Sequence, residues 1–551
     1  MIKLLKWSAG AVLAIGIAAA AVPSYAQGTP QGSLTEKRLA DLLVHARQAY
    51  DAGIRDTATT GGEVQPATQV AARPVIRLTP DEAVMRALEN NIELAVERLN
   101  PLLQDLSLAQ VRGAYRPTLT SLVNMSSANP LPTSLLTGGT KVKNDTMNIN
   151  AGVTQALPRY GGTVTAFWNN PRTDTTSSFA TLNPQYTPQI QFSVAQPLLR
   201  NFKIDNTRQS LLTTAISLDI SNTTLRARII NTEASTRNAY WDMVAAIRAV
   251  DVAKQSLSLA EKLVEDNKIR VEVGTLAPID IVQAEAEAAS RRQTLTVAEA
   301  TRSTTELTLK RLIVASTDDP LWNAVLDPTG TVQMESRTVD LEGAIKKALS
   351  GRTDLTNARR TLESSDISIR YLRNQMKPDV NATLTYGTRG LGGNTFVRVG
   401  GVIVDTIPGG WTDAMQTLLK REYPTWTVGV NFSYPIGQST QDAQHARAKV
   451  QYQQAQAQLR ALELQVAVEV TNAALQVEST QRRVDAARAA RTLSERRLEA
   501  EQTKFEVGMQ TNFFVVQAQR DLLDAQITEL RASLDYQKAI IELERVQAAG
   551  K

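Results

Sequence analysis

The chain contains no cysteine among its 551 residues. Disulfide bonds and thiolate metal sites are therefore excluded, and so is a lipid anchor on an N-terminal cysteine. Its two histidines, His45 and His445, lie far apart in the sequence, so a zinc site lacks ligands. No phosphate-binding loop and no Gly-x-Ser-x-Gly motif occurs, and no pair of carboxylates stands out. These absences predict a protein that is not an enzyme and binds no cofactor or catalytic metal.

An excess of charge of one sign is also missing. The chain has 60 basic and 55 acidic side chains, which gives a net charge of +5. No basic block of the kind that binds a phosphate backbone is present. We therefore expect no nucleic-acid partner.

Long apolar runs are absent after the N-terminus. The run from Ala9 to Val22 follows two lysines and precedes the small-x-small site at 24–26, where a signal peptidase could cut. This run is shorter than the ~20 residues of a membrane helix, so residues 1–26 are predicted to be a signal peptide. No later segment approaches about 18 apolar residues in a row, which leaves a closed β-barrel as the way to cross a membrane.

The sequence repeats itself. Ala87 and Ala348, each within a helical pattern, correspond at an offset of 261 (348 − 87), and the same offset relates Pro117 to Pro378. Further on, Gly274 and Gly508 correspond at an offset of 234 (508 − 274). The repeat predicts two similar units, with an insertion of about 27 residues in the first (261 − 234). We expect an N-terminal periplasmic arm and linker at 27–77, a first unit at 78–330 and a second at 331–551.

Each unit begins with a helical pattern, at 79–114 and 340–375, that ends before a proline. Strand-like alternation follows. Its clearest example is 426–436, where apolar and polar side chains alternate over about eleven residues, the length of a tilted membrane-spanning strand. Similar alternation occurs at 117–126, 147–157, 163–169, 188–198 and 380–386. A soluble β-sandwich would show the same alternation.

Two long segments, 208–270 and 447–507, contain neither proline nor glycine. Each would form a helix ~90 Å long at 1.5 Å per residue, with small apolar residues in a coiled-coil seam. Each runs to a Val-Gly pair, after which a second helix is predicted, at 279–315 and 513–548. The sequence thus predicts two long helical hairpins that alternate with two sets of strands.

This duplicated order resembles the TolC family of outer membrane efflux proteins over about 78–546. The resemblance implies an α+β membrane protein, in which three copies share one outer-membrane β-barrel that continues into a periplasmic α-helical coiled-coil barrel. It implies a passive exit duct of a tripartite efflux or secretion system, with partners in a periplasmic adaptor protein, an inner-membrane pump, outer-membrane lipid and the exported substrate. The alternative is a soluble or surface coiled-coil scaffold without transport activity.

The resemblance also implies functional residues at the hairpin tips. Adaptor docking is expected at two groups, which are Val273, Gly274 and Thr275, and Val507, Gly508 and Met509. The periplasmic aperture is expected at Asp280, Phe514 and Gln517. Asp280 from three copies could form a carboxylate ring that attracts cations. The alternative role for Asp280 is to stabilise a helix N-terminus.

The family pattern implies two wall strands per unit, hence four per chain and twelve per trimer. The first unit offers four segments with strand-like alternation. We expect the extra hairpin at 147–169 to lie on an elaborated loop, with membership of the barrel wall as the alternative. The segments at 128–145, 170–187 and 387–424 are then expected to be external loops.

Overall fold

The computed structural model describes residues 74–131, 141–274, 277–330, 339–399, 402–437 and 439–547. Contacts group the described part of the chain into one unit, Gln69–Lys551. The predicted signal peptide at 1–26 and nearly all of the predicted arm at 27–77 lie outside the described residues. Among the described residues, no helix is both long and apolar enough to cross a membrane.

Each expected entry helix is in fact two helices. α2 (Pro80–Asn90) is followed by α3 (Ile92–Gly113), and α7 (Leu341–Gly351) by α8 (Thr353–Gln375). The backbone of Asn91 is extended between the first pair, with ψ of 117°, and its side chain accepts the Leu94 N–H. The single helix expected at 79–114 was wrong at this point because an Asn side chain that caps a new helix competes with continuation of the old one.

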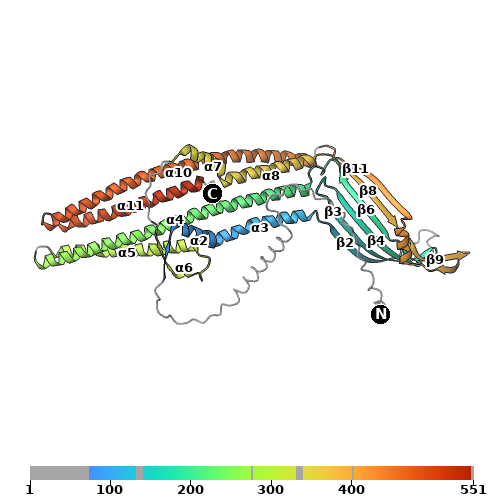
Figure 1. The fold of residues 1–551 in the computed structure, drawn as a ribbon, viewed down its shortest axis with the longest axis horizontal. Coiled ribbons are helices and arrows are strands. Elements are labelled where there is room, and N and C mark those ends of the chain that lie inside the picture. Colours follow the sequence, from blue (N-terminus) through green and yellow to red (C-terminus); the bar gives the residue numbers. More distant parts are fainter. Residues whose placement is uncertain are drawn as a thin grey trace, which may run out of the picture. The chain divides into compact units, whose positions relative to one another are not determined.

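Two long hairpins of equal dimensions dominate the helical part (Figure 1). The first comprises α4 (Asn206–Glu272) and α5 (Pro278–Ile313), and the second comprises α10 (Thr440–Glu506) and α11 (Asn512–Gln547). Asp205 and Ser439 cap the starts of α4 and α10 through their side chains. The long helices have 67 residues each, which corresponds to about 100 Å at 1.5 Å per residue.

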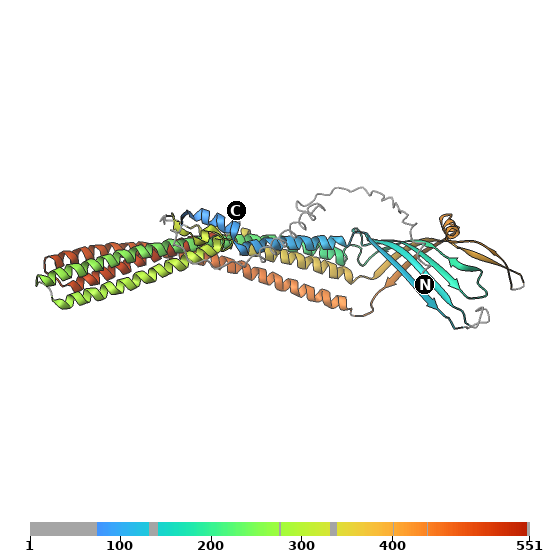
Figure 2. The ribbon, with the colours of Figure 1, turned by 90° about the horizontal axis from the view of Figure 1, so that it is seen from below.

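The helices pack lengthwise. α4 contacts α5, α10 contacts α11, and α4 also contacts α11; the shorter α3 lies on α4, and α8 lies against both α4 and α10 (Figures 1 and 2). Small side chains at the seam, such as Val466, Val470 and Ala473, are buried and allow close approach of the helices. The coiled-coil packing expected from the sequence is present.

A second core closes the junction between α2, α4 and α5. It includes a short parallel pair, β1 (Val75–Leu78) and β7 (Val325–Pro328), and the one-turn helix α6 (Pro320–Asn323). Tyr240 is fully buried there; its hydroxyl donates to the Leu78 carbonyl oxygen at 3.0 Å and accepts the Gly330 N–H at 2.8 Å.

Apart from β1 and β7, the described strands form one antiparallel sheet. Its six long members lie in the order β2 (Thr118–Ala128), β3 (Asn144–Ala156), β4 (Thr163–Thr175), β6 (Gln189–Pro197), β8 (Asp379–Arg389) and β11 (Tyr423–Ser433) (Figure 1). β6 of the first unit pairs directly with β8 of the second. The two units therefore share one sheet.

The expectation of four wall strands with an extra hairpin on a loop disagrees with this sheet. β3 and β4 make up that hairpin, and they pair along their length with each other and with β2 and β6 on either side. Alternation in the sequence shows that a segment has two different faces. The strand with which it pairs depends on register, which the alternation does not predict.

Two of the expected loops contain regular structure. β5 (Leu182–Tyr186) pairs with the end of β4 and with β9 (Gly392–Val399), which pairs with β10 (Val402–Ile407). A short helix, α9 (Trp411–Leu419), packs on β9. Glycine allows this contact because a Cβ on Gly392 would lie 2.5 Å from the Gly410 carbonyl oxygen.

Candidate functional site

The first hairpin turns at Val273 and Gly274. α4 ends at Glu272, the Gly274 backbone has φ of +79°, and α5 begins at Pro278. Val273 is 73 % exposed, so an aliphatic side chain stands in solvent at the tip. Thr275, the third residue predicted for adaptor docking, lies outside the described residues.

The second tip has the same geometry. Gly508 has φ of +76°, and its neighbours Val507 and Met509 are 66 % and 78 % exposed. The Met509 N–H donates to the Lys504 carbonyl oxygen at 2.8 Å and so satisfies an acceptor at the helix end. Open space surrounds the position of a Cβ at both Gly274 and Gly508, so glycine is needed for the positive φ and not for room.

Of the predicted aperture residues, Asp280 and Phe514 stand in the first turns of α5 and α11, and Gln517 stands in the second turn of α11. Asp280 is half-buried near the start of α5, and its carbonyl oxygen accepts the Asn267 side-chain amide at 3.4 Å. Phe514 is 45 % exposed and lies edge-on against Phe513, with ring centroids 5.6 Å apart. Gln517 donates its side-chain amide to Asp521 at 2.9 Å. Within the described ranges, no hydrogen bond or ion pair connects Asp280 to Phe514 or Gln517.

A charged contact that the sequence analysis missed connects the two hairpins close to the tips. Glu287 on α5 is 4 % exposed and accepts hydrogen bonds from Arg520 on α11, with one nitrogen at 3.1 Å. Arg291, one turn further along α5, holds the other carboxylate oxygen at 2.6 Å. A sequence signal did exist, because Glu287 and Arg291 share the buried face of α5 with Ala284 and Ala288.

The charge state of Glu287 follows from these partners. Burial alone would raise the pKa of its carboxyl, but the hydrogen bond from Arg520 and the positive charges of Arg291 and Arg520 outweigh it. The net effect is a pKa below its ordinary value of 4.5. Glu287 is therefore ionised at neutral pH and holds the two hairpins together through a charge-assisted hydrogen bond.

A second contact between the hairpins lies at the ends of the long helices. The Arg270 guanidinium of α4 lies over the Phe505 ring of α10, 4.2 Å from its centroid, and one nitrogen donates to the Phe505 carbonyl oxygen at 3.4 Å. Phe505 is 7 % exposed and belongs to a small cluster with Leu498 and Val515. This cation–π contact adds to the Glu287–Arg520 pair near the tips.

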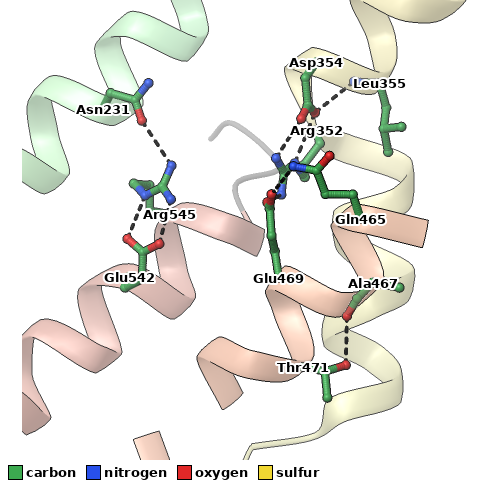
Figure 3. A network of polar contacts seen from close by, with 10 residues as sticks. All are labelled: Asn231, Arg352, Asp354, Leu355, Gln465, Ala467, Glu469, Thr471, Glu542 and Arg545. Carbon is green, nitrogen blue, oxygen red and sulfur yellow. Dashed lines mark hydrogen bonds and ion pairs between the residues drawn. The ribbon is translucent and has the colours of Figure 1, made fainter. Parts of the chain in front are cut away.

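Another polar network lies further along the helices, away from the tips (Figure 3). The Arg352 guanidinium, at the start of α8, forms ion pairs with Asp354 of the same helix and with Glu469 of α10. The nitrogen–oxygen distance is 2.6 Å in each pair. Burial would lower the pKa of Arg352, but the hydrogen bonds that it donates to both carboxylates raise it above its ordinary value. Nearby, Arg545 of α11 pairs with Glu542 and donates to Asn231 of α4 (Figure 3). The Arg352 contacts join α8 to α10, and the Arg545 contact with Asn231 joins α11 to α4.

The described residues contain no group of three His, Asp or Glu side chains placed to hold a metal ion. His445, on α10, has a pKa below its ordinary value because of burial and the nearby charges of Lys449 and Arg373. His45 lies outside the described residues. The features that this part of the chain presents are therefore two apolar tips and the charged contacts between two hairpins.

Comparison with known proteins identifies the class. A family model described as outer membrane efflux protein matches residues 134–314 and 344–549, which is more than half of the chain. No curated protein matches the sequence. The chain belongs to the outer membrane efflux protein family, which consists of channels and not of enzymes.

Solved structures share the fold at low sequence identity. The CmeC outer membrane channel of Campylobacter jejuni is 16 % identical, with a TM-score of 0.61 and 86 % of each chain covered. VceC of Vibrio cholerae is 16 % identical, with a TM-score of 0.61, and the match covers 85 % of this chain and 95 % of that one. The open MtrE channel of Neisseria gonorrhoeae is 17 % identical, with a TM-score of 0.58, and the match covers 89 % of this chain and 95 % of that one.

The resemblance to the TolC family drawn from the sequence is thus confirmed. The chain is an exit channel of the outer membrane in an efflux system, with its helices in the periplasm. The scaffold alternative is set aside by the family match.

Proposed function

We propose that three copies of the chain form one passive exit duct that the paired hairpins close at the periplasmic end. An inner-membrane pump supplies the energy, and its adaptor protein docks on the hairpin tips. Duplication supports this arrangement: α4 and α10 have 67 residues each, and α5 and α11 have 36 each. The units at 78–330 and 331–551 therefore present two equivalent hairpins per copy, six in the trimer.

Docking uses the aliphatic tips. Val273, Val507 and Met509 are exposed apolar side chains at the ends of the hairpins, and Ile269, Ile279, Val282 and Phe513, close to them along the chain, are exposed as well. Groups of exposed apolar side chains mark sites of protein interaction. Gly274 and Gly508 allow the tight reversal that presents these side chains at the ends of the hairpins, and Thr275 is assigned to the same docking surface from the sequence.

The gate is held by contacts between the hairpins of one copy, and these contacts carry the proposal. Arg520 reaches from α11 to a buried carboxylate on α5, and Arg270 reaches from α4 to Phe505 on α10. Breaking either contact weakens the hold of one hairpin on the other near the tips, while Lys538 of α11 and Asp242 of α4 keep them joined further along. Because Arg520 is half exposed, an adaptor at the tips can reach and displace it.

The Glu287–Arg520 and Arg270–Phe505 contacts together form a latch, and Asp280, Phe514 and Gln517 form the aperture beside it. In the trimer Asp280 contributes three carboxylates around the axis, and such a ring attracts divalent cations and lets them block the flow of monovalent ions. Gln517 and Phe514 are neutral, so the second hairpin adds no charge to this ring.

The test is single-channel recording in planar bilayers with Mg²⁺ added to the periplasmic side. Block by Mg²⁺ is expected for the parent and is expected to weaken at least tenfold for Asp280→Asn. Asp251→Asn is the matched control, because Asp251 is an exposed carboxylate on α4 located 22 residues before Val273 (273 − 251). Equal block in the parent and in Asp280→Asn would remove Asp280 from the aperture.

A further inference from the structure

The hairpin β3–β4 is the feature that most separates this chain from the expected four-strand pattern. Its strands have 13 residues each, as long as or longer than the flanking β2 and β6. We propose that this hairpin is part of the lipid-facing wall, so that each copy contributes six strands and three copies close a wall of eighteen (3 × 6). The count of three rests on the proposed function.

One line of paired residues crosses all six strands on one face. It consists of Leu119, Val153, Ala166, Phe192, Tyr386 and Trp426. Every member is apolar or aromatic, including the two from β3 and β4. Leu119 and Trp426, on the edge strands, are 73 % and 74 % exposed, so nothing in the described part of the chain covers this face at the edges.

The adjacent line of paired residues projects from the opposite face. It consists of Thr118, Thr154, Thr165, Ser193, Thr385 and Thr427. The hydroxyl oxygens of Thr154 and Thr165 lie 3.3 Å apart, and those of Ser193 and Thr385 lie 3.4 Å apart. A sheet with one apolar and one hydroxyl-bearing face suits a wall between lipid and water.

The hairpin keeps this division over much of its length. The apolar face carries Met147, Ile149 and Val153 of β3 and Val164, Ala166 and Trp168 of β4, and the polar face carries Asn148, Asn150, Thr154, Thr163, Thr165 and Asn169, with Phe167 as the aromatic exception. The division ends where the apolar face carries Gln155 at one end and Asp145, Asn170, Arg172 and Asp174 at the other. A hairpin on an aqueous loop would not need an apolar face in register with the apolar faces of β2 and β6. Lipid contact explains why the face is kept.

The polar face is closely packed within the hairpin. Gly152 pairs with Phe167, and a Cβ on Gly152 would lie 2.9 Å from the Phe167 ring and 3.4 Å from the Thr120 hydroxyl. The absence of a side chain at Gly152 lets the aromatic ring lie flat against the sheet. β2, β3 and β4 are thereby held in one register, as a wall requires.

The edges of the sheet fit a second copy of the chain. In the described residues, β2 pairs only with β3, and β11 pairs only with β8. Both edge strands have 11 residues. With an even number of strands, β11 of one copy runs antiparallel to β2 of the next, so a ring closes without breaking the alternation of strand directions.

The consequence is a wide outer opening. Barrel diameter grows roughly in proportion to strand number, and walls of about 16–18 strands enclose an aqueous channel. The hairpin adds no charged side chain to the polar face between Thr146 and Thr154 or between Thr163 and Pro171. The hairpin therefore widens the membrane section without adding charge to this stretch of its polar face.

The chain has no cysteine, so single cysteines can report on this wall directly. Ile149→Cys lies on the apolar face of β3 and Asn148→Cys on its polar face; Val194→Cys and Ser193→Cys are the matched pair on β6. The probe is a membrane-impermeant sulfonated maleimide applied to the full-length protein in liposomes. We expect labelling at least tenfold slower at Ile149→Cys than at Asn148→Cys, with the same ratio for the β6 pair.

Equal labelling of the β3 pair, with the β6 ratio preserved, would place the hairpin outside the wall and overturn this inference alone. Equal labelling of both pairs would mean that the sheet does not face lipid at all. That result would overturn the proposed duct as well.

Discussion

Removing Arg520 is expected to open the channel. In the structure the Arg520 side chain is 53 % exposed, whereas Glu287 is 4 % exposed and keeps Arg291 at 2.6 Å when Arg520 is absent. Arg520→Ala therefore does not leave the buried carboxylate without a partner, and the full loss of about 3–5 kcal/mol for a broken buried pair does not apply. Charge-assisted hydrogen bonds contribute about 1.5–3 kcal/mol, and solvent screening at Arg520 places this pair at the lower end.

A loss of about 1.4 kcal/mol per copy corresponds to about a tenfold shift in the closed-to-open ratio. Three copies that open together shift it about a thousandfold. The assay is release of calcein from proteoliposomes, normalised to the amount of inserted protein. Arg520→Ala is expected to release the dye much faster than the parent.

The matched control is Arg292→Ala. Arg292 lies on the same helix as Glu287 and pairs with Glu261 at 2.8 Å, but this pair joins α5 to α4 within a single hairpin. Its loss is expected to leave release unchanged. Equal release from Arg520→Ala and the parent, or equally fast release from the Arg292→Ala control, would refute the latch.

Three further outcomes follow from the same structure. The ionised Glu287 carboxylate stabilises the closed state. Because its pKa is lowered, this stabilisation is fully present above pH 4.5, the ordinary pKa of the carboxyl, and is lost as the pH falls through the lowered pKa. Calcein release should therefore rise below pH 4.5 in the parent and change little with pH in Glu287→Gln. Tyr240→Phe leaves the Gly330 N–H without the Tyr240 hydroxyl, while the Leu78 carbonyl oxygen keeps the Thr329 N–H at 3.0 Å, and should lower the free energy of unfolding by about 1–3 kcal/mol in thermal denaturation. Gly508→Val forces a β-branched residue to φ of +76° at a cost of about 1–3 kcal/mol, so photo-crosslinking from Met509 to the co-expressed adaptor should fall while the detergent-extracted oligomer keeps its mass.

The sequence predicted the hairpins well because their signals are local. The absence of proline and glycine, the small-residue seam and the Val-Gly pairs all act within a few helical turns. The turns at Gly274 and Gly508 lie where these signals placed them. Alternation over 426–436 likewise predicted most of β11, although the strand as observed ends at Ser433.

Long-range pairings could not be predicted in the same way. Glu287 and Arg520 are separated by 233 residues, and no sequence pattern near either residue identifies the other as its partner. The place of β3 and β4 in the sheet depends on register with strands before and after them. The glycines of the segment at 387–424 suggest turns and so predict a loop, whereas Gly392 instead allows α9 to pack closely on β9.

The central claim is that copies of this chain enclose one continuous tunnel through the outer membrane and into the periplasm. Single-particle electron microscopy of the detergent-extracted full chain tests it most directly. The account predicts three copies around one water-filled tunnel, with β11 of each copy paired to β2 of the next and the two hairpins of each copy converging at the closed end. A monomer with unpaired sheet edges, or an assembly without a central tunnel, would contradict it.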